Sequence, residues 1–275
     1  MKNILQIDVE DWYCDLDPRL WDKCEPRVVK ATDRVLAILK ASGNRATFFV
    51  LGYVAERFPE MVKKIAGEGH EIASHGYYHR RITNQAPEEF EEDLAKSVNL
   101  LETITGDKVK GYRAPQFTIV KETLWALPIL RRHGFEYDSS IFPVKTPLYG
   151  IPDSPLFPYA LEVETTFPTV DFMEVPLSVY TVPFLGKNIP VAGGFYLRFF
   201  PYFFIRHALK RINEKGRVAV CYIHPWELDP DKPRIEGLRW YHYYRLASTE
   251  KKFCRLLRDF VFVSTQQWIE HERIN

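Results

Sequence analysis

The residues of this chain that could do chemistry follow directly after short apolar runs. Three acids, Asp8, Glu10 and Asp11, come after the run that begins at Asn3. Strand alternation would place Asp8 and Glu10 on one side, with Asp11 opposite or already in the following turn. The cluster fits a solvated strand end, or a site at the carboxyl end of a strand, where barrel enzymes carry their chemistry.

Two histidines, His75 and His79, follow a short apolar segment that ends at Ser74. Imidazoles four residues apart lie on one face if the backbone turns helical, and they can then bind the same metal ion. Such pairs also occur on ordinary helices. Their position directly after a strand favours a functional pair.

Three more polar residues occur at later strand ends. Arg113 could be a surface residue, but its guanidinium could also hold one of the acids in place. Asp138 could serve a turn through a local hydrogen bond. His224 ends the most apolar strand of the chain. A core histidine bound to a backbone carbonyl is the usual interpretation, whereas a strand leaving the core favours an active-site position.

The elements that must position these residues alternate between strand-like and helix-like patterns. The alternation predicts an α/β fold in which a parallel barrel or sheet forms one domain. The expected strands are Asn3–Val9, Ala46–Leu51, Glu71–Ser74, Gly111–Pro115, Phe135–Ser139, Met173–Tyr180, Val218–His224 and Phe260–Ser264. The expected helices are Ala31–Ala41, one from Pro59 to the Gly67/Gly69 pair, Pro87–Thr105, Leu124–His133, Tyr202–Lys215 and Lys252–Arg258. Phe142–Pro168 and Leu228–His242 are expected to be irregular.

Composition narrows the functional classes. The 37 basic and 36 acidic residues leave a net charge of +1, which argues against a general electrostatic grip on nucleic acid or an anionic membrane. No apolar stretch is long enough for a membrane-spanning helix, and charged residues at Asp8 leave no room for a secretory h-region. The four cysteines lack CxxC spacing and indicate reduced thiols in a cytoplasmic protein.

Together these motifs carry a family resemblance. Asp8/Glu10, SHGYYH, RAP, YDSS and IHP resemble the five motifs of the NodB-like polysaccharide deacetylases, carbohydrate esterase family 4, over about residues 3 to 230. DVEDW, GYRAPQF, EYDSSIFP, GGFYLRFFPY and HPWELDPDKPRI resemble the branch associated with exopolysaccharide loci and exosortase systems. The resemblance implies a distorted (β/α)7 TIM-like barrel, so we expect one domain over residues 1–275 with a C-terminal extension from about residue 230.

The resemblance also implies a metal site. His75 and His79 match the metal-binding histidines, and the third ligand is either Glu10 or Asp11. Family members have adjacent aspartates, base then ligand, where this chain reads Asp-Val-Glu-Asp. The implied cofactor is a divalent ion; the ligand types favour Zn²⁺, and Co²⁺, Ni²⁺ or Mn²⁺ would also fit.

Catalytic roles carry over in the same way. Asp8 resembles the catalytic base and Arg113 the arginine that orients it. His224 matches the catalytic acid, and Asp138 stands at the position of the acid that polarises that histidine.

For substrate binding we expect Pro115, Gln116 and Trp226. Gln116 replaces the aromatic residue of many members, so only its backbone N–H is expected to face the oxyanion, while Trp226 is expected against the sugar. The implied reaction is hydrolysis of N-acetyl groups on a polysaccharide or glycan intermediate. The alternatives are an allantoinase-like amidohydrolase of a small C–N compound and a catalytically silent glycan-binding barrel.

Overall fold

The computed structural model describes residues 1–162, 172–182 and 186–274. Its first strand, β1 (Lys2–Val9), sorts its side chains by alternation. Leu5, Ile7 and Val9 pack into the large hydrophobic cluster beneath the surrounding helices. Ile4 belongs to a second apolar cluster, and Asp8 follows it on that side, where its carboxylate meets Arg113. One face of β1 therefore builds the core and the other leads to polar groups at its carboxyl end.

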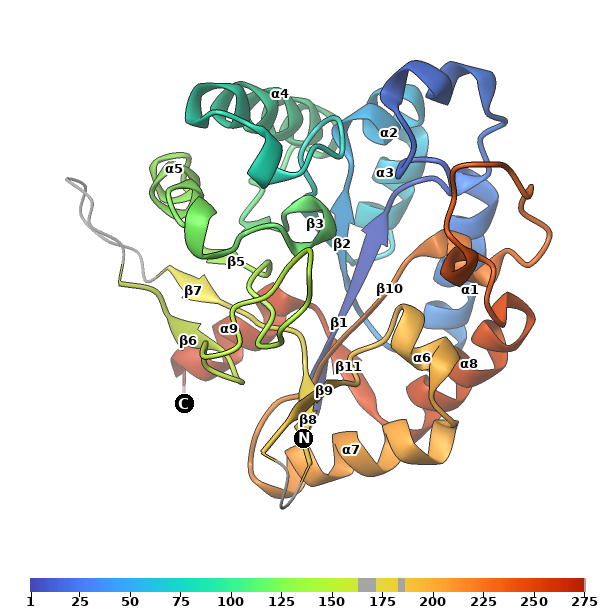
Figure 1. Ribbon diagram of the computed structural model, residues 1–275, viewed down its shortest axis with the longest axis vertical. Coiled ribbons are helices and arrows are strands. Elements are labelled where there is room, and N and C mark those ends of the chain that lie inside the picture. Colours follow the sequence, from blue (N-terminus) through green and yellow to red (C-terminus); the bar gives the residue numbers. More distant parts are fainter. Residues whose placement is uncertain (163–171, 183–185, 275) are drawn as a thin grey trace.

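Most of the strands form one curled sheet, in which β1 lies between β10 and β2 (Figure 1). Its order is β10-β1-β2-β3-β4-β5-β7-β6, and β11 pairs with the first residues of β1. All of these pairings are parallel except that of β6 with β7. The other strands are β2 (Thr47–Val50), β3 (Glu71–Ser74), β4 (Gly111–Tyr112), β5 (Tyr137–Asp138), β6 (Tyr159–Ala160), β7 (Met173–Glu174), β10 (Val220–Ile223) and β11 (Val261–Val263). The parallel strands bring their carboxyl ends to one end of the barrel.

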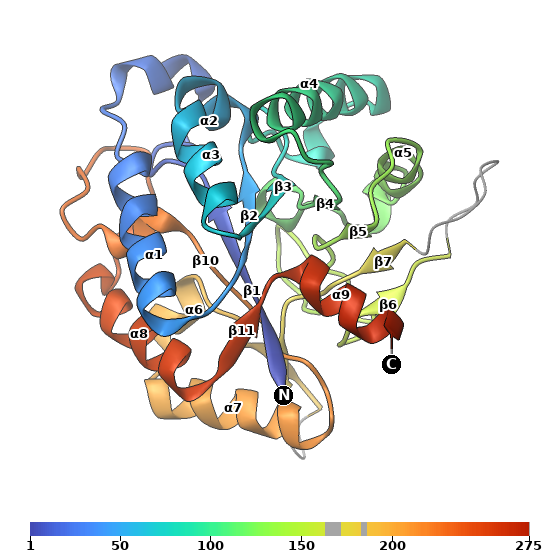
Figure 2. The same ribbon diagram turned by 180° about the vertical axis from the view of Figure 1, so that it is seen from behind.

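Helices cover the outside of the curled sheet (Figures 1 and 2). They are α1 (Val28–Ser42), α2 (Gly52–Arg57), α3 (Pro59–Gly67), α4 (Pro87–Thr105), α5 (Ala126–Arg132), α6 (Phe195–Phe199), α7 (Tyr202–Glu214), α8 (Thr249–Asp259) and α9 (Thr265–Ile274). This arrangement confirms the expected distorted α/β barrel. No helix among the described residues is both long and apolar enough to cross a membrane.

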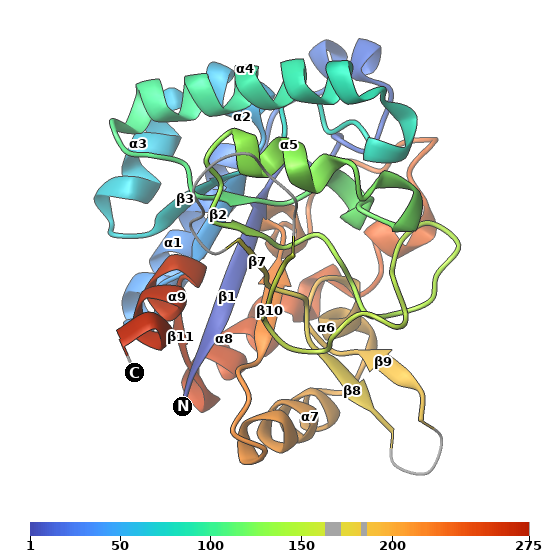
Figure 3. The same cartoon turned by 90° about the vertical axis from the view of Figure 1, so that its left-hand side faces the viewer.

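The gap in the sheet between β7 and β10 is bridged by the chain around Ser178. Its N–H donates to the Val220 carbonyl over 3.1 Å, and its hydroxyl accepts from the Val220 N–H over 2.8 Å. The following residues form an antiparallel pair, β8 (Val179–Thr181) and β9 (Asn188–Pro190), beside α7 (Figure 3).

Most expected elements are confirmed with small shifts at their ends, but one strand is not. The expected strand Met173–Tyr180 is split into β7 and β8, because Pro176 lies between them and has no N–H to offer a sheet. The described part of the expected loop Phe142–Pro168 is irregular apart from β6, and residues 163–168 of it lie outside the described residues. Leu228–His242 is confirmed as irregular apart from short turns of 3-10 helix.

A glycine beside β10 allows a test of how closely the chain packs where the barrel closes. Gly193 has φ +124° and forms a parallel bridge to Tyr222, and an added Cβ would lie 1.9 Å from the Tyr222 carbonyl oxygen. We expect Gly193→Ala to lower the free energy of unfolding by more than about 2 kcal/mol, measured by urea denaturation.

Gly216→Ala is the matched control. Gly216 also has positive φ (+69°), but an added Cβ there would meet no atom within 4 Å. Alanine at this position should therefore lower the free energy of unfolding only through its unfavourable positive φ, by about 1–2 kcal/mol. Equal losses in the two variants would contradict the proposed close approach at Gly193.

Candidate metal and catalytic centre

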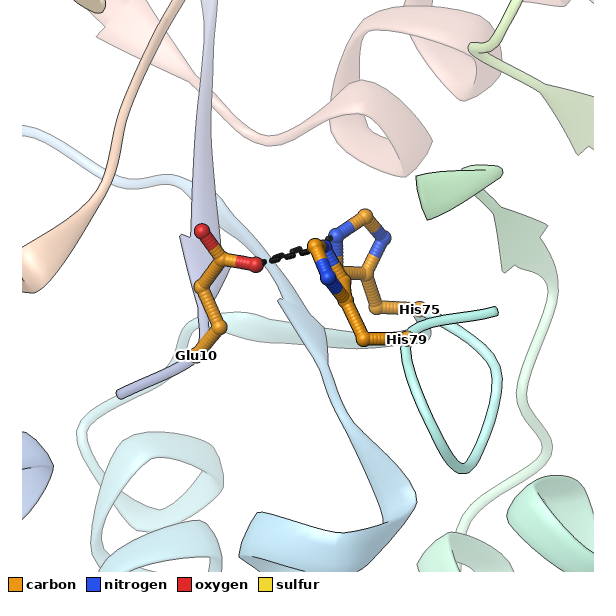
Figure 4. A group of neighbouring side chains, drawn as sticks. All are labelled: Glu10, His75 and His79. Carbon is orange, nitrogen blue, oxygen red and sulfur yellow. Dashed lines mark ion pairs between the residues drawn. The ribbon is translucent and has the colours of Figure 1, made fainter. Parts of the chain in front are cut away.

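Three side chains meet at the carboxyl ends of β1 and β3. The Glu10 carboxylate lies 2.6 Å from His79 Nε2 and 4.0 Å from His75 Nε2, and the three groups could hold one ion (Figure 4). The side chains are nearly inaccessible, with exposed fractions of 5% or less. Two imidazoles and one carboxylate form the donor set of a catalytic zinc-type site that leaves a position open for water or substrate.

Backbone carbonyls fix both imidazole rings. His75 Nδ1 lies 2.8 Å from the Arg113 carbonyl oxygen and His79 Nδ1 lies 3.2 Å from the Cys14 carbonyl oxygen. A carbonyl can only accept, so each Nδ1 carries the proton and each Nε2 lone pair faces Glu10.

This tautomer bears on whether an ion fits. With its proton on Nδ1, neutral His79 would set an Nε2 lone pair 2.6 Å from a carboxylate oxygen that has no hydrogen-bond donor among the described residues. Two such atoms this close need a positive charge between them. Without an ion, a proton on His79 Nε2 supplies that charge. Burial lowers the pKa of His79, but Glu10 outweighs burial and raises the pKa to about 9. Burial likewise opposes ionisation of Glu10, yet the neighbouring histidines hold its pKa well below the usual range. A divalent ion would satisfy the same groups, so the site fits the expected metal.

The loop between the two histidines is not the helical turn considered from the sequence. His79 has φ +54° and Gly76 φ +73°, values outside a right-handed helix. Asp93 on α4 fixes this turn by accepting from the N–H groups of Tyr77 (2.6 Å) and Tyr78 (3.2 Å). The two rings thus converge through a loop clamped by a neighbouring helix.

Asp11 does not join the triad. Its carboxylate accepts from the backbone N–H groups of Trp12 (2.9 Å), Arg27 (2.9 Å) and Val28 (3.1 Å). It therefore caps the start of α1. Of the two open candidates for the third ligand, the geometry brings only Glu10 to the histidines.

Asp8 lies beside the triad and is held by Arg113. The guanidinium Nη1 is 2.6 Å from Asp8 Oδ1, and both side chains are buried. The other carboxylate oxygen of Asp8 is 3.9 Å from His224 Nε2. The structure thus brings together the expected base, its arginine and the expected acid.

The partner of His224 is Glu227. The Glu227 carboxylate lies 2.6 Å from His224 Nδ1, and Arg198 on α6 donates to it from Nε over 2.8 Å. Burial lowers the pKa of His224, but the hydrogen bond to Glu227 and the charges of Glu10 and Asp8 raise it to about 9. Burial raises the pKa of Glu227, yet Arg198 and His224 bring it to about 2.

The expectation that Asp138 polarises His224 is therefore wrong. Asp138 accepts from the Ser140 hydroxyl over 2.6 Å and is hydrogen-bonded to the buried Glu174. Its burial raises the pKa of Asp138 to about 6. The signal that could have identified Glu227 is its spacing: three residues after His224, an acid can turn back to the imidazole.

A cavity of about 550 Å³ opens above these groups. Its floor includes Asp8, Glu10, His75, His79 and His224. Aromatic side chains form much of its wall: Phe117, Tyr149, Phe195, Tyr196, Trp240 and Tyr241. Most of these rings come from the second half of the chain.

The three expected substrate-binding residues have different positions. Gln116 lines the cavity with φ +53°, and its side-chain amide links Asp15 and Arg81. Pro115 is buried and does not line the cavity. Trp226 lines the cavity and is 6% exposed.

Trp226 also holds two side chains of the site in place. Its indole N–H donates to Glu10 over 3.1 Å, and its ring stacks on His224 at 5.0 Å. Trp226 thus holds two side chains of the site, and its expected contact with sugar stays a prediction.

Comparison with known proteins shows which families and relatives this chain is similar to. Residues 20–137 match the polysaccharide deacetylase model, and residues 139–270 match a domain of unknown function, DUF3473. A peptidoglycan-N-acetylglucosamine deacetylase of Bacillus cereus is 38% identical over 34% of this chain and 35% of its own length. The peptidoglycan deacetylase-like protein FGM2 of Gibberella zeae is 36% identical over 42% of this chain. The match spans 32% of that relative's length, so this chain aligns with about a third of each of these two proteins.

A solved structure extends the similarity beyond that region. A candidate polysaccharide deacetylase of Mycobacterium smegmatis superposes with a TM-score of 0.67 and 26% identity, covering 98% of this chain and 89% of its own. Fold and site define an α/β barrel in which a Glu/His/His cluster that could hold a metal ion faces a carboxylate and a histidine. These findings support the resemblance of this chain to the NodB-like polysaccharide deacetylases of carbohydrate esterase family 4.

Zn²⁺ binding by variants tests whether Glu10 or Asp11 is the third metal ligand. We expect His79→Ala and Glu10→Gln each to weaken Zn²⁺ binding by at least about 100-fold, because losing even an outer-shell partner costs 10- to 100-fold. Isothermal titration of the metal-free protein measures this.

Asp11→Asn is the control for that measurement. It should bind Zn²⁺ as the unaltered chain does, while the weakened cap lowers the free energy of unfolding by about 1 kcal/mol. Loss of Zn²⁺ binding in folded Asp11→Asn would contradict the assignment of Glu10.

Proposed function

We propose that this protein is a metal-dependent deacetylase that hydrolyses N-acetyl groups of a glycan. The observation that carries the proposal is the placement of Asp8 and His224 beside the Glu10/His75/His79 triad at the floor of one cavity. Amide hydrolysis needs a group that accepts a proton from water and one that donates a proton to the departing amine. The floor of the cavity offers one of each.

Asp8 is the proposed base. Arg113 occupies its Oδ1 and leaves Oδ2 directed toward His224 and the cavity. Because Arg113 is itself fully buried and hydrogen-bonded to Ser139, the carboxylate is held in one orientation.

His224 is the proposed acid. The Glu227 carboxylate supports the imidazolium form, and the raised pKa of His224 keeps it protonated at neutral pH. A protonated imidazole can deliver its Nε2 proton to the sugar nitrogen, which would otherwise depart as a strongly basic amide anion.

A divalent ion held by Glu10, His75 and His79 would polarise the acetyl carbonyl and acidify a bound water. We propose zinc for this ligand set, with Co²⁺, Ni²⁺ or Mn²⁺ as ions that would also fit. The backbone N–H of Gln116 is proposed to stabilise the oxyanion, supported by the position of this residue in the cavity wall.

We propose an N-acetylglucosamine-containing glycan as the substrate, since that sugar appears in the name of the Bacillus cereus relative. The exopolysaccharide setting implied by the sequence motifs is part of this proposal. A reducing, cytoplasmic location is proposed as well, supported by the free thiols of Cys14, Cys24, Cys221 and Cys254.

Acetate release from N-acetylglucosamine oligomers tests the assignment of the acid. We expect His224→Ala to lower kcat by about 10² to 10⁴, the usual contribution of a general acid, while Zn²⁺ binding persists. A chelator should abolish the activity of the unaltered protein.

Three other results would each speak against the proposal. Full activity of His224→Ala would contradict the assignment of His224 as the acid. Hydrolysis of allantoin alone would favour the small-molecule amidohydrolase. Glycan binding without acetate release by the zinc-loaded protein would favour the silent barrel.

The pair His224–Glu227 also predicts a pH effect. The acid works only when protonated, so kcat falls as pH rises through the pKa of His224. Glu227→Gln removes a charge and hydrogen bond that raise this pKa. The alkaline limb of the pH–kcat profile should therefore move to lower pH. Asp138→Asn alters an acid outside this pair, so the folded variant should keep the alkaline limb at its original pH. A shift of that limb in Asp138→Asn but not in Glu227→Gln would identify Asp138 as the partner of His224.

A further inference from the structure

The cavity is lined in part by residues 239–242, which belong to the irregular segment between β10 and α8. Trp240 in this segment is 65% exposed, although its ring packs edge-on against Phe195 (5.8 Å) and Tyr244 (5.7 Å). An exposed indole held by neighbouring rings at a cavity mouth offers a flat apolar surface, which suits the C–H face of a pyranose.

The position of this segment is fixed relative to the proposed acid. Arg198 donates from Nη1 to the carbonyl oxygens of Tyr241 (2.7 Å) and Tyr244 (2.9 Å), and from Nε to Glu227 (2.8 Å). Farther in, His242 Nε2 lies 3.3 Å from Asp15 in the loop after β1, and Figure 1 shows the two loops side by side. One buried guanidinium thus sets the distance between the aromatic surface and His224.

Two arginines adjoin the aromatic surface. Arg239 lines the cavity and is hydrogen-bonded to Tyr241. Arg81 is held by Gln116, whose carbonyl accepts from Arg81 Nε over 2.6 Å, and its charge also acts on the Tyr241 phenol. Gln116 therefore places a second guanidinium at the same rim.

Both guanidinium groups lack an acidic partner among the described residues, where no carboxylate lies within 4 Å of either. The cavity's other arginine, Arg198, and the buried Arg113 beneath it are each paired with a carboxylate. Asp15, an acid that also lines the cavity, accepts from the Gln116 amide and lies 3.3 Å from His242. The rim thus presents positive charge with free donors, the arrangement that binds carboxylate or phosphate groups.

We propose that the rim selects an anionic glycan, with Trp240 stacked on a sugar ring and Arg239 and Arg81 bound to a carboxylate or phosphate on that ring or its neighbour. This inference rests on the proposed deacetylase function and names its substrate class. Both sources of negative charge share the recognition chemistry, and the experiment separates them.

The test uses three N-acetylglucosamine-containing probes of matched length in the zinc-loaded protein: a neutral chitin oligomer, a heparosan oligomer with alternating glucuronate, and a chitin oligomer carrying a phosphate monoester. We expect at least one anionic probe to give a KM lower than the neutral probe. Arg239→Ala and Arg81→Ala should each reduce this preference by about tenfold, which corresponds to one charge-assisted hydrogen bond.

Arg234→Ala is the matched control. Arg234 lies in the same irregular segment but packs over Tyr243 and does not line the cavity, so this variant should keep the preference of the unaltered chain. Trp240→Ala should raise KM for all three probes, because every probe presents a sugar face. Added salt should weaken the anionic preference only.

Binding of the three probes to Asp8→Asn separates the two levels of the proposal. Preferential binding of an anionic probe without turnover by the unaltered protein would sink the deacetylase function and keep the rim. Turnover of the neutral probe with equal or better KM than both anionic probes would overturn the rim and keep the function. Equal losses in Arg239→Ala and Arg234→Ala would also overturn it.

Discussion

Arg113 has a fully buried guanidinium that joins three strands of the barrel. It donates to Asp8 on β1 and to Ser139 after β5, and its own carbonyl, directly after β4, fixes the His75 ring. A buried charge is costly unless its donors are satisfied, so these acceptors and the Phe49 ring at 4.3 Å must stay in place together. One residue thereby sets the orientation of the proposed base and of a histidine of the proposed metal site, and the rest of the cavity floor is arranged around them.

The site draws on the first strand and on both segments that match a family model. β1 leads to Asp8 and Glu10, and residues 20–137 supply His75, His79 and Arg113. Residues 139–270 supply His224, Glu227 and most of the aromatic rim. β10 joins these parts by pairing with β1, which places His224 next to Asp8. Arg198 then ties the proposed acid to the rim, so the chemistry and the mouth of the cavity share one support.

Periodicity sufficed to predict the barrel and most of its strands, because buried parallel strands are mainly apolar and the polar residues at their ends stand out. The alternation rule placed Glu10 on the same side as Asp8, and in the structure Glu10 is the acid that lies beside His75 and His79, since side-chain direction in a strand depends only on strand geometry. The partner of His224 could not be read the same way. Asp138 and Glu227 both follow strands, and the choice between them depends on a turn in which Pro225 and Trp226 bend the chain back. The burial of Trp226 likewise depends on the segment that folds over it.

The pairing of β1 also governs how the protein folds during synthesis. β1 finds β2 and β3 early, because they are close in sequence, but the partner of its other edge, β10, is made only when residues 220–223 leave the ribosome. Until then β1, which carries the core residues Leu5, Ile7 and Val9, has one unpaired edge, the feature that draws other chains into aggregates. The nascent protein therefore carries the first half of its barrel with an open edge, and a chaperone that shields extended apolar segments would act on that intermediate.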